Sequence, residues 1–121
     1  MYLLEEEKQI IIEYLRNKIK LKFIYLFGSF AKGEGRVDSD IDLAIYPVEN
    51  INSYDLFTIS NDLSFKVNRD VQIVDLKDID TVFAAQIVGN REELYCQDEL
   101  LMLNYNIKIL REYAKLNEER Q

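Results

Sequence analysis

The chain has 121 residues, of which 48% are hydrophobic and 31% charged, with a net charge of −7 and no histidine. This length and hydrophobic content suit one compact domain over residues 1–121. The negative charge argues against binding a nucleic-acid backbone as the main task and suits a basic protein partner. The single cysteine, Cys96, excludes an internal disulfide, and the lack of histidine excludes Cys/His zinc clusters, histidine-based triads and a histidine general base.

The first residues, MYLLEEEKQI, are acidic where a secretory signal peptide would be basic. No apolar run approaches the length of a transmembrane helix, and no linker, low-complexity tract or internal repeat interrupts the chain. We therefore expect a cytoplasmic protein that does not act at a membrane.

Residues 3 to about 20 are expected to form a helix with two apolar stripes. One stripe has the spacing of a helix that packs on a sheet and consists of Leu4, Ile11, Leu15 and Ile19. A smaller stripe, roughly 100° away, consists of Leu3, Ile10 and Tyr14.

The most informative stretch runs from Lys22 to Ile45, KFIYLFGSFAKGEGRVDSDIDLAI. Its first half is an apolar run of strand length, and Gly28 then permits the sharp backbone turn that Ser29 and the next residues need to open a helix. A strand that ends at a glycine turn can direct free backbone N–H groups at a phosphate. Lys32 would lie one turn further on, near enough to add its charge to a triphosphate site.

The second half of this stretch carries two aspartates on a predicted strand. Asp40, Asp42 and Ala44 fall on one face because side chains alternate with period two, which places the Cα atoms of the two aspartates about 6.6 Å apart. Two unpaired carboxylates at this distance repel, so the arrangement favours a divalent cation between them and the phosphates of a nucleotide. The alternative is an ordinary Gly-Ser turn followed by solvated aspartates.

A helix and a further strand are predicted after the aspartates. Pro47 ends the aspartate strand, and Asn52 or Ser53 can cap a helix that crosses over to the next strand. That strand spans residues 69–75 and has Asp70 near its start.

A third helix and a short strand are predicted next. Asp78 or Asp80 can cap the helix, which Gly89 and Asn90 would end in the left-handed conformation. The strand is expected at residues 93–96. These alternating elements predict an α/β fold, with a sheet flanked by helices.

The final helix is expected to run from a cap at Asp98 to about Leu116, and it also has two apolar stripes. The first consists of Leu103, Ile107, Leu110 and Ala114. The second, about 130° away, consists of Met102, Tyr105, Ile109, Tyr113 and Leu116. Since a helix on a sheet needs only one stripe, we expect the second, together with the extra stripe of the N-terminal helix, to form a partner or self-association surface. The alternative is that the two helices pack on each other.

The spacing of Gly28-Ser29, ten residues, then Asp40-Ile41-Asp42 resembles the signature of the nucleotidyltransferase superfamily related to DNA polymerase beta. More closely, GSFAKGEGRVDSDIDLAI is similar to the minimal nucleotidyltransferases, or MNT proteins. These are the antitoxins of toxin–antitoxin pairs whose toxin is a HEPN-domain ribonuclease. The resemblance implies the nucleotidyltransferase fold, an α/β (α+β) arrangement with a small mixed sheet flanked by helices.

The resemblance also implies a third carboxylate on the strand that follows the aspartate strand, and Asp70 fits that position. The alternatives are Asp75, or a structural pairing of Asp70 with Arg69 or Lys66. One departure is Lys32, where the family more often has arginine, which keeps the charge but loses the bidentate fork.

The reaction implied by the resemblance is transfer of a nucleotide to a hydroxyl, with ATP as the donor. Two magnesium ions would be held by three catalytic carboxylates, Asp40, Asp42 and Asp70. The β and γ phosphates would be bound by Gly28, Ser29 and Lys32. Asp70 would help to deprotonate the attacking hydroxyl, because no histidine is available.

A chain of this length has room for a catalytic sheet but not for an acceptor-binding domain, so we expect another protein or an interface to bring the acceptor. The resemblance implies that AMP passes from ATP to a tyrosine hydroxyl of the HEPN toxin, which blocks its ribonuclease activity. Two alternatives remain open: an antitoxin that acts by binding and occlusion alone, and an aminoglycoside-type nucleotidyltransferase completed by a homodimer. The intact carboxylate motif favours catalysis, since clustered carboxylates cost stability when nothing binds them.

Overall fold

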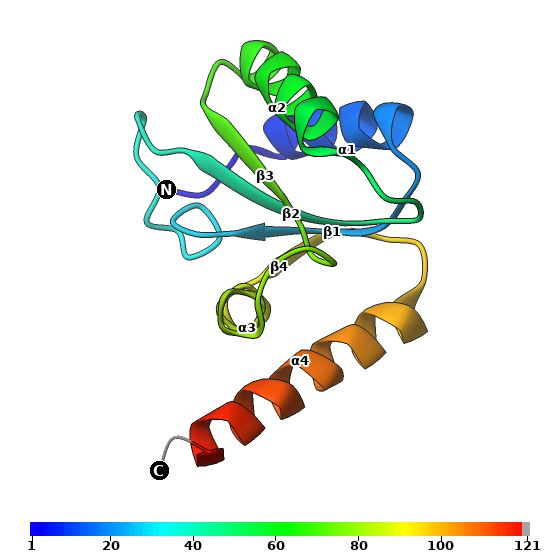
Figure 1. The fold of residues 1–121 in the computed structure, drawn as a ribbon. Helices are drawn as coiled ribbons and strands as arrows, with labels where there is room; N and C mark the ends of the chain where they lie inside the picture. The colour runs from blue at the N-terminus through cyan, green and yellow to red at the C-terminus, as the bar shows by residue number, and fades with distance from the viewer. Residues whose placement is uncertain (120–121) are drawn as a thin grey trace.

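The computed structural model of the protein describes residues 1–119 and contains a four-stranded mixed sheet with helices on both faces (Figure 1). The strands are β1 (Leu21–Phe27), β2 (Ile41–Pro47), β3 (Val71–Asp75) and β4 (Glu92–Cys96). The helices are α1 (Glu5–Lys18), α2 (Ser53–Val67), α3 (Thr81–Gly89) and α4 (Glu99–Glu119). The predicted fold class is confirmed.

The strand order β3-β2-β1-β4 gathers three strand ends at one end of the sheet. β1 runs antiparallel to β2, with Phe27 opposite Asp42, and β2 runs parallel to β3, with Ile41 beside Val71. The end of β1 therefore lies beside the starts of β2 and β3. We call this the aspartate end of the sheet.

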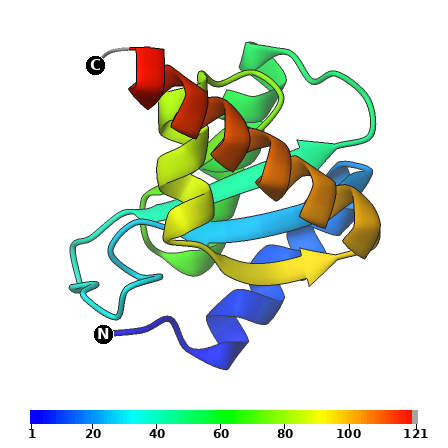
Figure 2. The same ribbon diagram turned by 90° about the horizontal axis from the view of Figure 1, so that it is seen from below.

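Each face of the sheet is covered by two helices, which Figures 1 and 2 show from two directions. α1 and α2 pack on the face whose buried residues include Ile24, Leu26, Leu43 and Ile45. α3 and α4 cross the opposite face, whose buried residues include Phe23, Tyr25 and Ala44. Within residues 1–119, no helix is both long and apolar enough to cross a membrane.

Three of the predicted helix caps are present. The side chains of Asn52, Asp80 and Asp98 accept hydrogen bonds from backbone N–H groups in the first turns of α2, α3 and α4, at 2.8, 2.8 and 3.0 Å. The predicted left-handed end at Gly89 and Asn90 is wrong, because Asn90 has φ −125°. The left-handed residue is instead Asn68 at the end of α2, with φ 55°.

The helix expected after Gly28 is also absent. Residues 29–33 form consecutive turns, in which the Lys32 N–H donates to the Ser29 carbonyl at 3.2 Å. Gly33 has φ +76° and packs closely on Tyr2, a conformation that a continuing helix does not allow. The chain therefore leaves the turn as a loop that returns to Asp40.

The assignment of the apolar stripes is reversed on α4, where the second stripe faces the sheet and α3, with Met102 and Ile109 buried. At the N-terminal helix the predicted core stripe is confirmed for Ile11 and Leu15. Tyr14 of the extra stripe, and Leu3 just before α1, also belong to the core. α1 and α4 lie on opposite faces of the sheet, so they do not pack on each other (Figure 1). The exposed stripe of α4 consists of Leu100, Leu103, Ile107 and Leu110.

One buried hydrogen bond links β1 to α4. The Tyr25 hydroxyl donates to Asn106 Oδ1 at 2.6 Å, and both residues are buried. Burial raises the pKa of Tyr25 to about 12, so the hydroxyl stays protonated and donates. This bond fixes the rotation of α4 that buries its second stripe.

Tyr25→Phe is expected to lower the free energy of unfolding by about 1–2 kcal/mol, because it leaves a buried acceptor without its donor. Chemical denaturation monitored by circular dichroism measures the change. Tyr54→Phe, at a residue that is 76% exposed, is the matched control and should leave stability unchanged. Equal stability of the Tyr25→Phe variant and the wild type would contradict this role.

Candidate active site

The turn after β1 combines a left-handed glycine with available backbone donors. Gly28 has φ +74°, and a Cβ atom built on it would collide with Asp42 Oδ2, so only glycine fits there. Among the hydrogen bonds of residues 1–119, none is donated by the backbone N–H of Ser29 or Phe30. Such donors at a tight turn suit an anionic ligand, as predicted for a phosphate.

Asp40 and Asp42 lie beside this turn. Asp42 is the second residue of β2 and is half-buried, while Asp40 is exposed just before the strand. Burial raises the pKa of the Asp42 carboxyl above its usual value of 3.8, and the neighbouring charge of Asp40 raises it further. The structure therefore brings these two predicted residues together at an energetic cost to the ionised form of Asp42.

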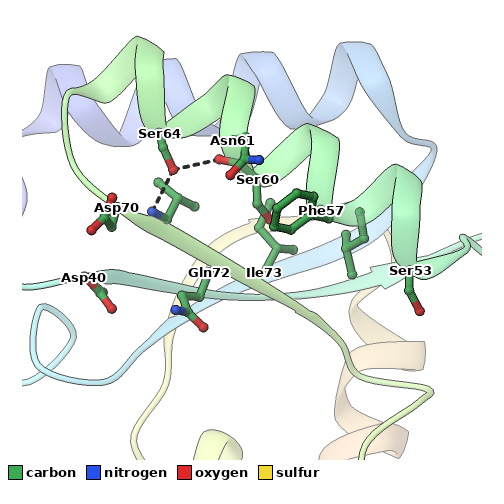
Figure 3. Close-up of a pocket in the computed structure, with 11 residues that line it drawn as sticks. Asp40, Ser53, Phe57, Ser60, Asn61, Ser64, Asp70, Gln72 and Ile73 are labelled. Carbon is green, nitrogen blue, oxygen red and sulfur yellow. Dashed lines mark hydrogen bonds between the residues drawn. The ribbon is translucent and has the colours of Figure 1, made fainter.

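Asp70 lies at the same end of the sheet. It precedes β3, and its carbonyl accepts a hydrogen bond from the Ile41 N–H at 2.8 Å, which joins the starts of β2 and β3. Asp70 and Asp40 line one hollow, and Figure 3 shows their side chains there. They directly precede the neighbouring strands β3 and β2. The third predicted carboxylate thus lies at the start of the strand beside that of the other two.

The structure does not support the alternatives for this position. Asp75 lies at the opposite end of β3, where its carboxylate accepts from the backbone of Lys77. Arg69 pairs with Glu7 at 2.9 Å, and Lys66 lies over the ring of Tyr14, 5.6 Å from its centroid. Neither cation is therefore the partner of Asp70.

The three aspartates fit a divalent cation by donor type but do not form a ready cluster. Within residues 1–119, no three Cys, Asp or Glu side chains lie close enough to bind one metal ion together. Carboxylate oxygens are the ligands that Mg²⁺ prefers. Because Asp40 and Asp70 are exposed, their carboxylates can rotate toward a cation without loss of core packing.

A second hollow, of about 240 Å³, opens on the other side of the Gly28 turn. Gly28 and Lys32 line it together with four residues of α3 and its C-cap: Phe83, Gln86, Ile87 and Asn90. The α3 residues were not predicted as part of the site, because nothing in the spacing of that helix distinguishes it from an ordinary core helix. Lys32 is exposed at the rim of this hollow, where its charge can reach a bound phosphate.

Arg69 fastens the loop between the Gly28 turn and Asp40. Its guanidinium pairs with Glu7 and donates to the Val37 carbonyl at 3.0 Å. It also lies 5.0 Å from the ring centroid of Phe30, in a cation–π arrangement. The sequence suggests for Arg69 only a pairing with Asp70, because these contacts come from segments distant in the sequence.

A family model described as polymerase beta, nucleotidyltransferase, matches residues 9–100. The chain belongs to this family. Within this family, the chain is 35% identical over 124 residues to the protein adenylyltransferase MntA of Shewanella oneidensis. The aligned region covers 100% of this chain and 86% of MntA. The expected relationship of this nucleotidyltransferase to the MNT proteins is confirmed.

Two solved structures extend this relationship to the fold. A crystal structure of a toxin-antitoxin with AMP-PNP contains a chain that is 32% identical, with a TM-score of 0.87, over 94% of this chain and 92% of that one. A structure of the tri-AMPylated Shewanella oneidensis HEPN toxin in complex with its MNT antitoxin gives 29% identity and a TM-score of 0.84, over 97% and 92% of the two chains. This nucleotidyltransferase therefore shares nearly its whole fold with MNT antitoxins.

Asp42→Asn is expected to raise the Tm by about 2 to 5 °C at pH 7 without added metal ions. Folding raises the pKa of Asp42 above its usual value of 3.8, so the ionised carboxylate destabilises the folded state at pH values above the raised pKa. Below pH 3.8 the carboxyl is protonated in both the folded and the unfolded state, and this destabilisation disappears. The gain should therefore shrink as thermal melts are taken from pH 7 toward pH 4.

The control is Asp78→Asn, which changes the charge equally at an exposed residue. It should show no comparable gain. A lower Tm for Asp42→Asn than for the wild type at pH 7 would show that the ionised Asp42 carboxylate does not destabilise the fold.

Proposed function

We propose that this protein is the antitoxin of a HEPN/MNT toxin–antitoxin pair and that it transfers AMP from ATP to a tyrosine hydroxyl of its cognate HEPN ribonuclease toxin. The observation that carries the proposal is that Asp40, Asp42 and Asp70 lie at one end of the sheet, where Asp42 also lies against the Gly28 turn. The full-length similarity to the protein adenylyltransferase MntA supports it. So does the similarity to a complex that contains a tri-AMPylated toxin.

ATP binds on the side of the Gly28 turn. The backbone N–H groups at Ser29 and Phe30 donate to phosphate oxygens, and Lys32 adds a positive charge. The hollow lined by Phe83 of α3 lies beside this turn and can accommodate the nucleoside. The γ and β phosphates thereby lie at the turn, and the α phosphorus faces the aspartates.

The three aspartates form the reaction centre. Asp40, Asp42 and Asp70 would hold two Mg²⁺ ions, which would neutralise charge on the phosphates and stabilise the departing pyrophosphate. Asp70, on the strand farthest from the Gly28 turn, accepts the proton of the attacking hydroxyl at a carboxylate oxygen. Arg69 keeps the loop before Asp40 in place through Glu7 and the Val37 carbonyl.

A second candidate function is neutralisation by occlusion alone. The exposed stripe of α4, Leu100, Leu103, Ile107 and Leu110, favours it, because a surface of this kind suits a protein partner. Occlusion alone does not explain why two carboxylates are held together beside a glycine turn at a cost to stability.

Incubation of the toxin with this protein, ATP and Mg²⁺ should add one or more AMP units to the toxin, measured by intact-protein mass spectrometry. Asp70→Asn should slow the transfer by about 10²- to 10⁴-fold, because it removes a metal ligand and proton acceptor. Asp78→Asn should transfer AMP at the wild-type rate. A toxin that is neutralised without any added AMP would favour occlusion and contradict the proposal.

A further inference from the structure

A hollow of about 450 Å³ lies between α2 and the edge strand β3, directly beside two of the aspartates. Asp40 and Asp70 line its end, and α2 forms one wall, which Figure 3 shows with Phe57 and Asn61 on it. The Ser64 hydroxyl links α2 to β3, since it accepts a hydrogen bond from the Val71 N–H at 2.9 Å and donates one to the Ser60 carbonyl at 2.8 Å.

The order of elements at the aspartate end separates this hollow from the Gly28 turn. The turn ends β1, Asp40 and Asp42 lie at the start of β2, Asp70 precedes β3, and the hollow lies between β3 and α2. Displacement at phosphorus is in line, so the attacking oxygen approaches opposite the departing pyrophosphate. A donor with its pyrophosphate at the Gly28 turn therefore requires an acceptor that arrives from the side of β3 and α2.

The lining of the hollow defines the chemistry of that acceptor. Within the part of the chain that the structure describes, two carboxylates and no lysine or arginine line it, which disfavours a nucleic-acid acceptor with its phosphates. Phe57 is 65% exposed although it is large and apolar, and it offers a surface for an aromatic ring. Asn61 and Gln72 are exposed amides that can bind the backbone of an extended segment.

We propose that this hollow is the acceptor groove, in which a tyrosine-bearing segment of the partner protein binds with its ring against Phe57 and its hydroxyl toward Asp70. This inference rests on the proposed function and identifies where the acceptor enters. Among the strands of residues 1–119, β3 pairs with β2 alone, so its outer edge can support an extended segment. Phe57 is a specificity-determining residue in this account, and it takes no part in ATP binding.

The test measures two quantities for each variant: the KM for the toxin in AMP transfer, and the Kd for a non-hydrolysable ATP analogue with Mg²⁺. Phe57→Ala should raise the KM for the toxin about ten- to a hundredfold and leave the Kd for the analogue unchanged. Asn61→Arg, which fills the groove from the next turn of α2, should have the same effect. The control is Tyr54→Ala, since Tyr54 is 76% exposed on the same helix and does not line the groove.

If the wild type modifies the toxin but Phe57→Ala and Asn61→Arg leave the KM for the toxin unchanged, the assignment of this hollow as the acceptor groove is wrong. The proposed function would remain intact. Weaker binding of the ATP analogue to Phe57→Ala would also overturn the groove assignment, since the groove would then belong to the nucleotide. A wild type that adds no AMP to the toxin would overturn both the function and the groove. Thermal melts of all variants confirm that each is folded.

Discussion

The close approach of the Asp42 carboxylate to Gly28 is the constraint on which the rest of the site depends. Antiparallel pairing of β1 with β2 produces this contact, and only a glycine with φ +74° leaves room for it. The carboxylate is partly removed from water and has Asp40 beside it, so its ionised form is disfavoured. Strain of this kind is typical of functional sites, where a bound ligand compensates for it.

The strand order of the mixed sheet places this contact between two sides of the site, one at Gly28 and one at Asp70. Because β2 is antiparallel to β1 but parallel to β3, a turn, a carboxylate pair and a third aspartate meet at one end of the sheet. α3 flanks the side of Gly28, and α2 flanks the side of Asp70. Arg69 connects this end to α1 through Glu7, so the loop before Asp40 depends on packing away from the three aspartates.

The local chemistry of the site could be predicted from the sequence, whereas the orientation of the helices could not. The glycine turn and the carboxylates are specified by residue type and spacing within a short stretch, and the fold follows from the alternation of helices and strands. Both stripes of α4 are apolar, however, and which one is buried depends on long-range contacts such as that of Tyr25 with Asn106. The hollow beside α3 and the contacts of Arg69 likewise arise from segments distant in the sequence.

The central claim is that the aspartates at the Gly28 turn catalyse chemical modification of the partner. The most direct test is peptide mass spectrometry of the cognate toxin purified from cells that produce it with this protein or with its Asp40→Asn variant. We predict AMP on a toxin tyrosine with the wild type and an unmodified toxin with the variant. An unmodified but inactive toxin in the presence of the wild type would contradict it.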